Sequence, residues 1–187
     1  MIIEEERLLE IIKLELPATK YLKFLPNIEN MILHQATKES SLFIYSTRYE
    51  PNLNDFSIGL FQILTKTIEW LDFTGDYLEM FEDNVQVKYA IKYLDYLYSK
   101  FPEIKNIKER TKIMFSAYNC GKATINKCIK RGLADEQIYY NGANTTQGKW
   151  STYKNINKMM IKYNITSNKN AEINKRYVDY ITKGLIK

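Results

Sequence analysis

Hydrophobic residues recur along most of the chain at intervals of three and four positions, the spacing of one face of an α-helix. Residues 41–57 lose this rhythm and are rich in Ser, Thr, Asn and Pro, so we expect an exposed loop that contains, at most, a short β-hairpin. Residues 132–149 are irregular and are expected to form a surface loop. The rhythm predicts helices over about residues 2–14, 27–40, 58–71, 84–100, 107–118, 122–131, 151–163 and 170–184, with a short helical turn at 18–25.

The composition agrees with one mainly α-helical domain of about eight helices. The chain has 187 residues, and its 7 glycines and 4 prolines are too few for the many turns of an all-β sandwich. The net charge of +5 suits a polyanionic partner, but Lys and Arg are scattered along the chain. A nucleic-acid-binding helical domain would concentrate them on one helix face, so we expect no nucleic acid partner. With a single histidine and no Cys/His cluster, we expect no metal site.

Glu39 is an acidic residue on the apolar stripe of a predicted helix. The helical wheel of residues 27–40 places it within about 20° of Ile28, so the carboxyl group is expected to point inward. A carboxyl group against an apolar wall resists ionising and can therefore serve as a general acid near neutral pH. His34 lies about 140° away around the same helix, and we interpret it as a packed or surface histidine rather than a catalytic partner.

Two further segments carry polar groups suited to a neutral, hydroxyl-rich ligand. In residues 57–63, Gly59 permits close backbone approach, and the amide of Gln62 can both donate and accept hydrogen bonds. The helix break at Gly121 leaves Tyr118 and Asn119 at a helix end, where side chains can reach a groove. Cys120 and Cys128 would lie roughly 12 Å apart on one continuous helix, so a disulfide requires Gly121 to bend the chain, and two reduced thiols are the favoured interpretation.

Four segments, in this order, resemble motifs of the lytic transglycosylases related to goose-type lysozyme. Residues 39–43 resemble the Glu-Ser motif that ends the catalytic helix, and residues 57–63 resemble the Gly-Leu-Met-Gln-Ile motif. Residues 117–121 resemble the Ala-Tyr-Asn-x-Gly motif, and residues 174–178 resemble the C-terminal Tyr-Val motif. Phe61 stands where methionine is usual, and Ile173 stands where a glutamate is common, so only Tyr177 of the last motif is carried over.

The resemblance implies a lysozyme-like fold and cleavage of the β-1,4 bond between N-acetylmuramic acid and N-acetylglucosamine in peptidoglycan. Glu39 would act first as acid and then as base, forming a 1,6-anhydro ring without a cofactor. Tyr118 and Tyr177 would hydrogen-bond near the Glu39 carboxyl group. Ser57, Gln62 and Asn119 would bind the substrate.

Two alternatives remain open. Glu50 or Asp55 could act as a second acid that positions water, which would make the enzyme an inverting lysozyme (muramidase) that hydrolyses the bond. The chain could also be a wall-binding module without catalysis. Glu39 argues against this second alternative, because a binding protein has no use for a buried acid.

The anchors of the resemblance span residues 27–181, so we expect a catalytic domain at 26–187 and, at 1–25, a helical extension packed on it. The first seven residues are acidic and no long uncharged apolar run follows, so we expect neither a signal peptide nor a transmembrane segment. The expected partner is the glycan strand, bound by a monomer in the periplasm or cell wall. The enzyme would arrive there by phage-type release from a host cytoplasm, or with a leader that this sequence lacks.

Overall fold

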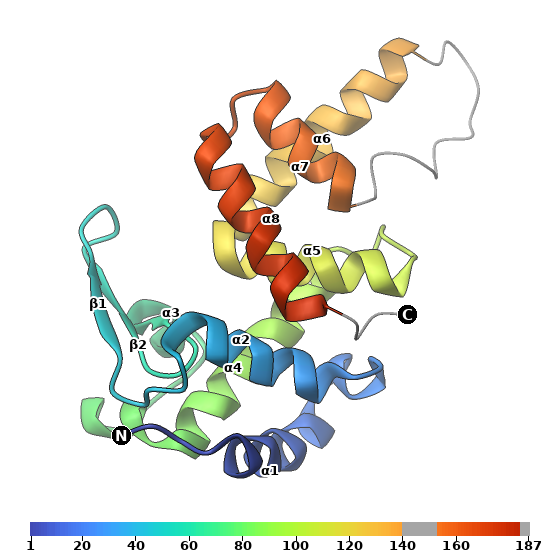
Figure 1. Ribbon diagram of the computed structural model, residues 1–187. Coiled ribbons are helices and arrows are strands. Elements are labelled where there is room, and N and C mark those ends of the chain that lie inside the picture. Colours follow the sequence, from blue (N-terminus) through green and yellow to red (C-terminus); the bar gives the residue numbers. More distant parts are fainter. Residues whose placement is uncertain (140–152, 184–187) are drawn as a thin grey trace. The chain divides into compact units, whose positions relative to one another are not determined.

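The computed structural model describes residues 1–139 and 153–183. These residues form two compact units, one made of Met1–Tyr96 with Lys183 and the other of Leu97–Thr182. Across the described ranges the chain forms eight α-helices and one small sheet, which confirms the predicted mainly α fold (Figure 1). Within the same ranges, no helix is both long enough and apolar enough to span a lipid bilayer.

The helices of the first unit follow the predicted apolar periodicity. Helix α1 buries Leu8, Ile11 and Ile12 and packs on α2, which in turn buries Ile28 and Met31. The elements are α1 (Glu5–Glu15), the 3-10 turns η1 (Leu16–Ala18) and η2 (Leu22–Phe24), α2 (Ile28–Ser40), α3 (Thr65–Trp70), the 3-10 turn η3 (Tyr77–Phe81) and α4 (Asp83–Ser99), which continues into the second unit.

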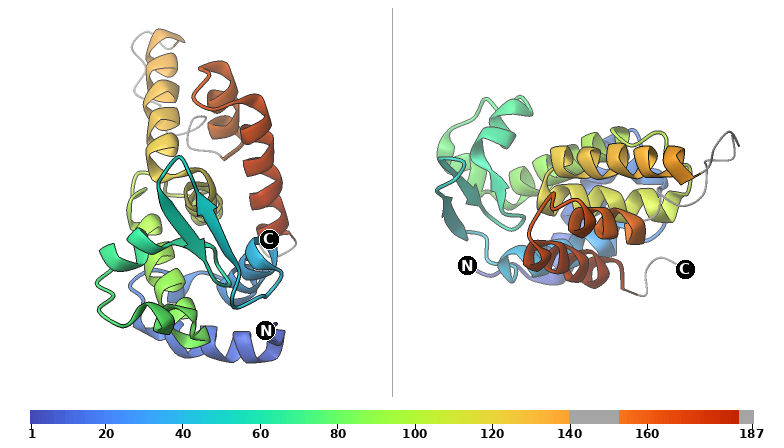
Figure 2. Two further views of the ribbon diagram at one scale, coloured as in Figure 1. Left: turned by 90° about the vertical axis from the view of Figure 1, so that its left-hand side faces the viewer. Right: turned by 90° about the horizontal axis from the view of Figure 1, so that it is seen from above.

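A three-stranded antiparallel sheet follows α2, and it contains the short hairpin that the sequence predicts. The strands are β1 (Thr47–Glu50), β2 (Asp55–Ile58) and β3 (Ile63–Leu64), in the order β1-β2-β3. Figure 2 shows β1 and β2 running side by side. In their register Arg48 lies opposite Ser57 and Glu50 opposite Asp55, so these four polar side chains share one face of the hairpin.

The helix predicted over residues 58–71 is wrong in its first half. Ile58 ends β2 and pairs with Ile63 of β3, and the helix begins only at Thr65. Between the strands the backbone turns through Gly59 and Gln62, which have φ angles of +72° and +48°, in the left-handed region that an α-helix cannot use. A short apolar run fits a buried strand as well as a helix, which explains the error.

The second unit is a cluster of four helices in which α5 packs against each of the other three. They are α5 (Ile107–Cys120), α6 (Lys122–Tyr139), α7 (Tyr153–Lys162) and α8 (Asn168–Thr182) (Figure 1). The loop predicted from residue 132 is wrong as far as Tyr139, because α6 continues through a segment containing good helix formers such as Leu, Ala, Glu and Gln. The rest of that predicted loop, residues 140–149, lies outside the described residues.

Candidate functional site

Glu39 lies in the last turn of α2 and is half-buried. The helix ends at Ser40, because Ser41 adopts a left-handed conformation with φ of +53°, and its N–H donates to the carbonyl of Thr37 at 3.0 Å. The last turn of a helix carries partial negative charge from its unpaired carbonyls. Glu39 therefore presents its carboxyl group at the C-terminal end of α2, partly shielded from solvent.

The polar face of the hairpin, on strands β1 and β2, holds Ser57 in a hydrogen-bonded cluster. Its hydroxyl group lies 3.1 Å from Glu50 Oε1, 3.2 Å from Gln62 Oε1 and 3.4 Å from the carbonyl of Arg48. Glu50 Oε1 also pairs with Arg48 Nε at 2.6 Å. Because a hydroxyl group has only one hydrogen, Ser57 can donate a hydrogen bond to only one of these three oxygens at a time. The structure therefore brings three predicted site residues, Glu50, Ser57 and Gln62, into direct contact.

The Gln62 amide group also shapes the turn between β2 and β3. Its Nε2 donates to the carbonyls of Ser46 at 3.2 Å and Gly59 at 3.0 Å, while its Oε1 faces the Ser57 hydroxyl. Both amide hydrogens thus have backbone acceptors within the first unit. Hydrogen bonding of Gln62 to a sugar stays a prediction. Its Oε1 has a second lone pair that could accept a hydrogen bond from a sugar hydroxyl group.

Gln86 of α4 holds the same turn through hydrogen bonds, and it is not among the residues predicted from the sequence. This buried side chain accepts from the N–H of Leu60 at 2.6 Å and donates to the carbonyl of Ile44 at 3.1 Å. A Cβ atom added to Gly59 would overlap the Gln86 amide, so glycine is required for this close approach as well as for its positive φ. The signal was present in the sequence, because Gln86 falls at helical spacing from the inward-facing Ala90 and Leu94.

Asp55, a predicted second acid, holds the start of α3. Its side chain is 5% exposed and accepts hydrogen bonds from the Thr65 hydroxyl, from the Phe56 N–H at 2.8 Å and from the Lys66 N–H at 3.3 Å. Thr65 and Lys66 are the first residues of α3, whose free N–H groups attract a carboxylate. Both oxygens of Asp55 are therefore engaged in a structural contact.

In the second unit, the predicted residues come from α5 and α8. Tyr118 is half-buried and Asn119 is exposed at the end of α5, and Gly121, with φ of +85°, terminates that helix. Tyr177 of α8 is 3% exposed. One turn earlier, the buried Asn174 donates from Nδ2 to Ser116 Oγ at 2.7 Å, which fastens α8 to α5. Asn174 opens the C-terminal motif, but the sequence analysis carried over only Tyr177.

Both cysteines are free thiols, as the favoured interpretation held. Burial raises the pKa of Cys120 from 9.0 to about 12 and that of Cys128 to about 11. Near neutral pH both groups are protonated, and a protonated thiol is a poor nucleophile and a poor metal ligand. Within the described ranges, no group of three or more His, Cys, Asp or Glu side chains is arranged to hold a metal ion.

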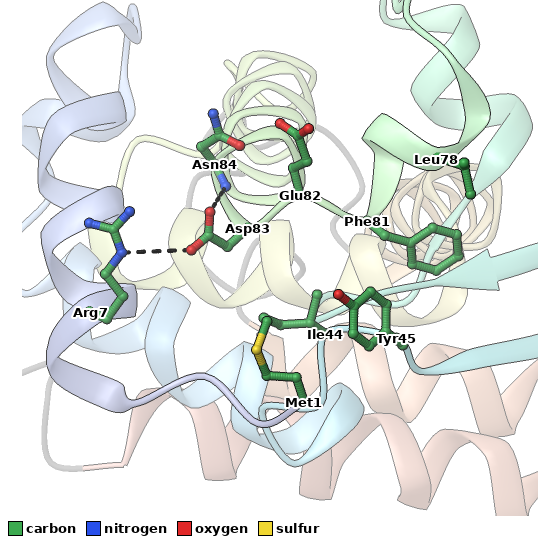
Figure 3. Close-up of a pocket in the computed structure, with 9 residues that line it drawn as sticks. All are labelled: Met1, Arg7, Ile44, Tyr45, Leu78, Phe81, Glu82, Asp83 and Asn84. Atoms are coloured by element: carbon green, nitrogen blue, oxygen red, sulfur yellow. Dashed lines mark hydrogen bonds and ion pairs between the residues drawn. The ribbon is translucent and has the colours of Figure 1, made fainter.

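A pocket of about 480 Å³ opens in the first unit, and none of its lining residues belongs to the four motifs (Figure 3). In its wall Arg7 of α1 pairs with Asp83 at 3.6 Å, and the other lining side chains are apolar or aromatic except for Glu82 and Asn84. Glu39 does not line this pocket. Its lining residues are Met1, Arg7, Ile44, Tyr45, Leu78, Phe81, Glu82, Asp83 and Asn84.

A mainly helical fold with a small antiparallel sheet, preceded by a helix whose last turn carries a half-buried glutamate, matches the lysozyme-like class. The model of the family described as "Transglycosylase SLT domain" matches residues 18–141, more than half of the chain. The chain belongs to this family, whose members are lytic transglycosylases that cleave peptidoglycan, a polymer found outside the cytoplasm. The match includes Glu39 and ends before Tyr177. A search of curated proteins found no match.

Proposed function

We propose that the protein cleaves the β-1,4 bond between N-acetylmuramic acid and N-acetylglucosamine and forms a 1,6-anhydro product, with Glu39 as acid and then as base. The observation that carries this proposal is the position of Glu39, half-buried in the last turn of α2 and inside the segment that matches the family. The first step needs a carboxyl group that can donate a proton to the bridging oxygen.

The proposed reaction conserves its protons and needs no water. Glu39 donates its proton to the bridging oxygen, and the bond from that oxygen to the anomeric carbon breaks. The substrate's own acetamido group stabilises the positive charge at the anomeric carbon. The Glu39 carboxylate then takes the proton of the C6 hydroxyl group, whose oxygen bonds to the anomeric carbon. Glu39 ends the cycle protonated, as it began.

The surroundings of the two candidate second acids favour this route over hydrolysis. Asp55 is 5% exposed and its oxygens serve the start of α3, and Glu50 pairs with Arg48 and Ser57 through Oε1. An inverting hydrolase needs a carboxylate that can hold and activate a water molecule. Asp55 is buried against the start of α3, and Glu50 is paired with Arg48 and Ser57, so neither carboxylate is well placed to activate a water molecule, which favours anhydro formation.

For the remaining predicted residues, we propose roles in substrate binding. Ser57 would offer its hydroxyl group and Gln62 its amide oxygen to a sugar, and Asn119, exposed at the end of α5, would offer its amide. Tyr118 and Tyr177 would orient the reacting group through their hydroxyls. These proposals rest on the order and chemistry of the motifs.

The test is the mass of the fragments released from purified peptidoglycan. Anhydro ends weigh one water less than the reducing ends made by hydrolysis, so the wild type should release anhydro fragments. Glu39→Gln should release neither product, and Glu29→Gln, the same change in the first turn of α2, should remain active. Reducing ends from the wild type would refute the anhydro route, and near-normal activity of Glu39→Gln would refute the assignment of the acid.

A further inference from the structure

Gln35 is a buried amide on α2 that the fold does not explain. Its side chain is 0% exposed, yet neither its Oε1 nor its Nε2 has a hydrogen-bond partner. Burying an amide without partners costs free energy that an apolar residue would not. By contrast, Gln86 is also buried, but both of its amide atoms are hydrogen-bonded. Gln35 therefore opposes stability at a position where an apolar residue would pack without this cost.

The position of Gln35 on the same helix face as Glu39 suggests a role for its amide. The two residues are four positions apart on one continuous helix, so they lie one above the other on the same face. Helix side chains lean toward the N-terminus, and that of Glu39 leans back over the turn that carries Gln35. Gln35 is fully buried and Glu39 is half-buried, so the amide is the more deeply buried of the two groups.

An amide suits a carboxyl group that alternates between two protonation states. Its oxygen can accept a hydrogen bond from a protonated carboxyl group, and its NH₂ group can donate to an ionised carboxylate. A lysine, an arginine or a second carboxylate would favour only one of the two states. A glutamate that acts as acid and then as base passes through both within each cycle.

We propose that Gln35 is a positioning residue for Glu39: the Gln35 amide, which has no hydrogen-bond partner in this structure, forms a hydrogen bond to the Glu39 carboxyl group during the reaction, as that group changes from acid to base. This inference rests on the proposed function of Glu39. Because Gln35 is 0% exposed, it acts on the substrate only through Glu39 and is not itself a catalytic residue. It is therefore expected to affect the rate of the chemical step and not the binding of the glycan.

The test replaces the amide by an apolar side chain of the same length, Gln35→Met. The control is Asn157→Leu on α7, which also removes a buried amide with an unpartnered oxygen. Steady-state rates are measured on soluble glycan strands and normalised to folded protein, and stability is measured by urea unfolding. For Gln35→Met we expect kcat to fall at least about tenfold, KM to change less than about twofold and stability to hold or rise. For Asn157→Leu, kcat and KM should both stay within about twofold of the wild type.

Stability and activity moving in opposite directions is the signature of the proposed role, because a purely structural amide would change both together. Gln35→Met with wild-type kcat would overturn the inference, and so would a loss of folding, since the amide would then serve the fold. A rise in KM that matches the fall in kcat/KM would also overturn it. These results differ from a failure of the proposed function, which would appear as an active Glu39→Gln variant whatever Gln35→Met does.

Discussion

Replacing Gly59 by alanine tests how the turn between β2 and β3 is held. The backbone at Gly59 has φ of +72°, and a Cβ atom there would overlap the side-chain amide of Gln86. The alanine must therefore adopt a left-handed conformation and also displace Gln86. Displacement breaks the hydrogen bonds of Gln86 to the Leu60 N–H and the Ile44 carbonyl, which now measure 2.6 and 3.1 Å.

The expected cost follows from these two effects. A left-handed conformation costs a residue with a Cβ about 1–2 kcal/mol. Two lost hydrogen bonds add about 1 kcal/mol each. The free energy of unfolding should therefore fall by about 3–4 kcal/mol, which corresponds to a fall in Tm of roughly 10 °C for a chain of this size.

The assay is urea unfolding followed by circular dichroism, with two comparisons. Gly121→Ala also forces a positive φ, of +85° with ψ of 138°, but nothing lies within 4 Å of its added Cβ, so its cost of about 1–3 kcal/mol comes from backbone strain alone. In a Gln86→Ala background, Gly59→Ala should cost only about 1–2 kcal/mol, which leaves a coupling of about 2 kcal/mol between the two sites. Equal costs for Gly59→Ala in both backgrounds would refute the close contact.

Two other changes probe Asp55 and the thiols. Asp55→Ala should lower the free energy of unfolding by about 1–3 kcal/mol, because the N–H groups at the start of α3 lose their acceptor. The kcat of the folded fraction should stay near the wild-type value. A fall in kcat of more than tenfold would instead indicate that Asp55 acts as a second acid. Because burial raises the thiol pKa values of Cys120 and Cys128 from 9.0 to about 12 and about 11, the unfolded chain releases protons that the native state keeps. The free energy of unfolding should therefore fall above pH 9 by about 1.4 kcal/mol per pH unit for each thiol. It should fall less steeply with pH in Cys120→Ala than in the wild type. Identical pH slopes of the two proteins between pH 9 and 10.5 would contradict the effect of burial on the thiol pKa values.

Much of the helical architecture could be predicted because its signal is local. Helix periodicity located α1, α2, α4 and α5, and the loss of rhythm after residue 40 located the hairpin. The same periodicity singled out Glu39, because a charged residue on an apolar stripe is visible without any tertiary contact. The order of the motifs then indicated the family to which the chain belongs.

The contacts that shape the candidate site join residues far apart along the chain, and the sequence could not pair them. Gln86 reaches Ile44 across 42 positions, and Asn174 reaches Ser116 across 58. Asp55 had two plausible roles until the structure placed it against the start of α3.

By itself, then, the sequence determined most of the helices and the family, and it singled out Glu39 as the candidate acid, because periodicity and motif order depend on neighbours along the chain. Only the tertiary structure decided that residues 59–62 form a turn, that Asp55 supports a helix and that the Gln35 amide is buried without partners. These properties depend on which residues, far apart in the sequence, come into contact in the folded chain. The spacing of hydrophobic residues indicates which face of a helix is buried, but it does not indicate which side chains pack against that face.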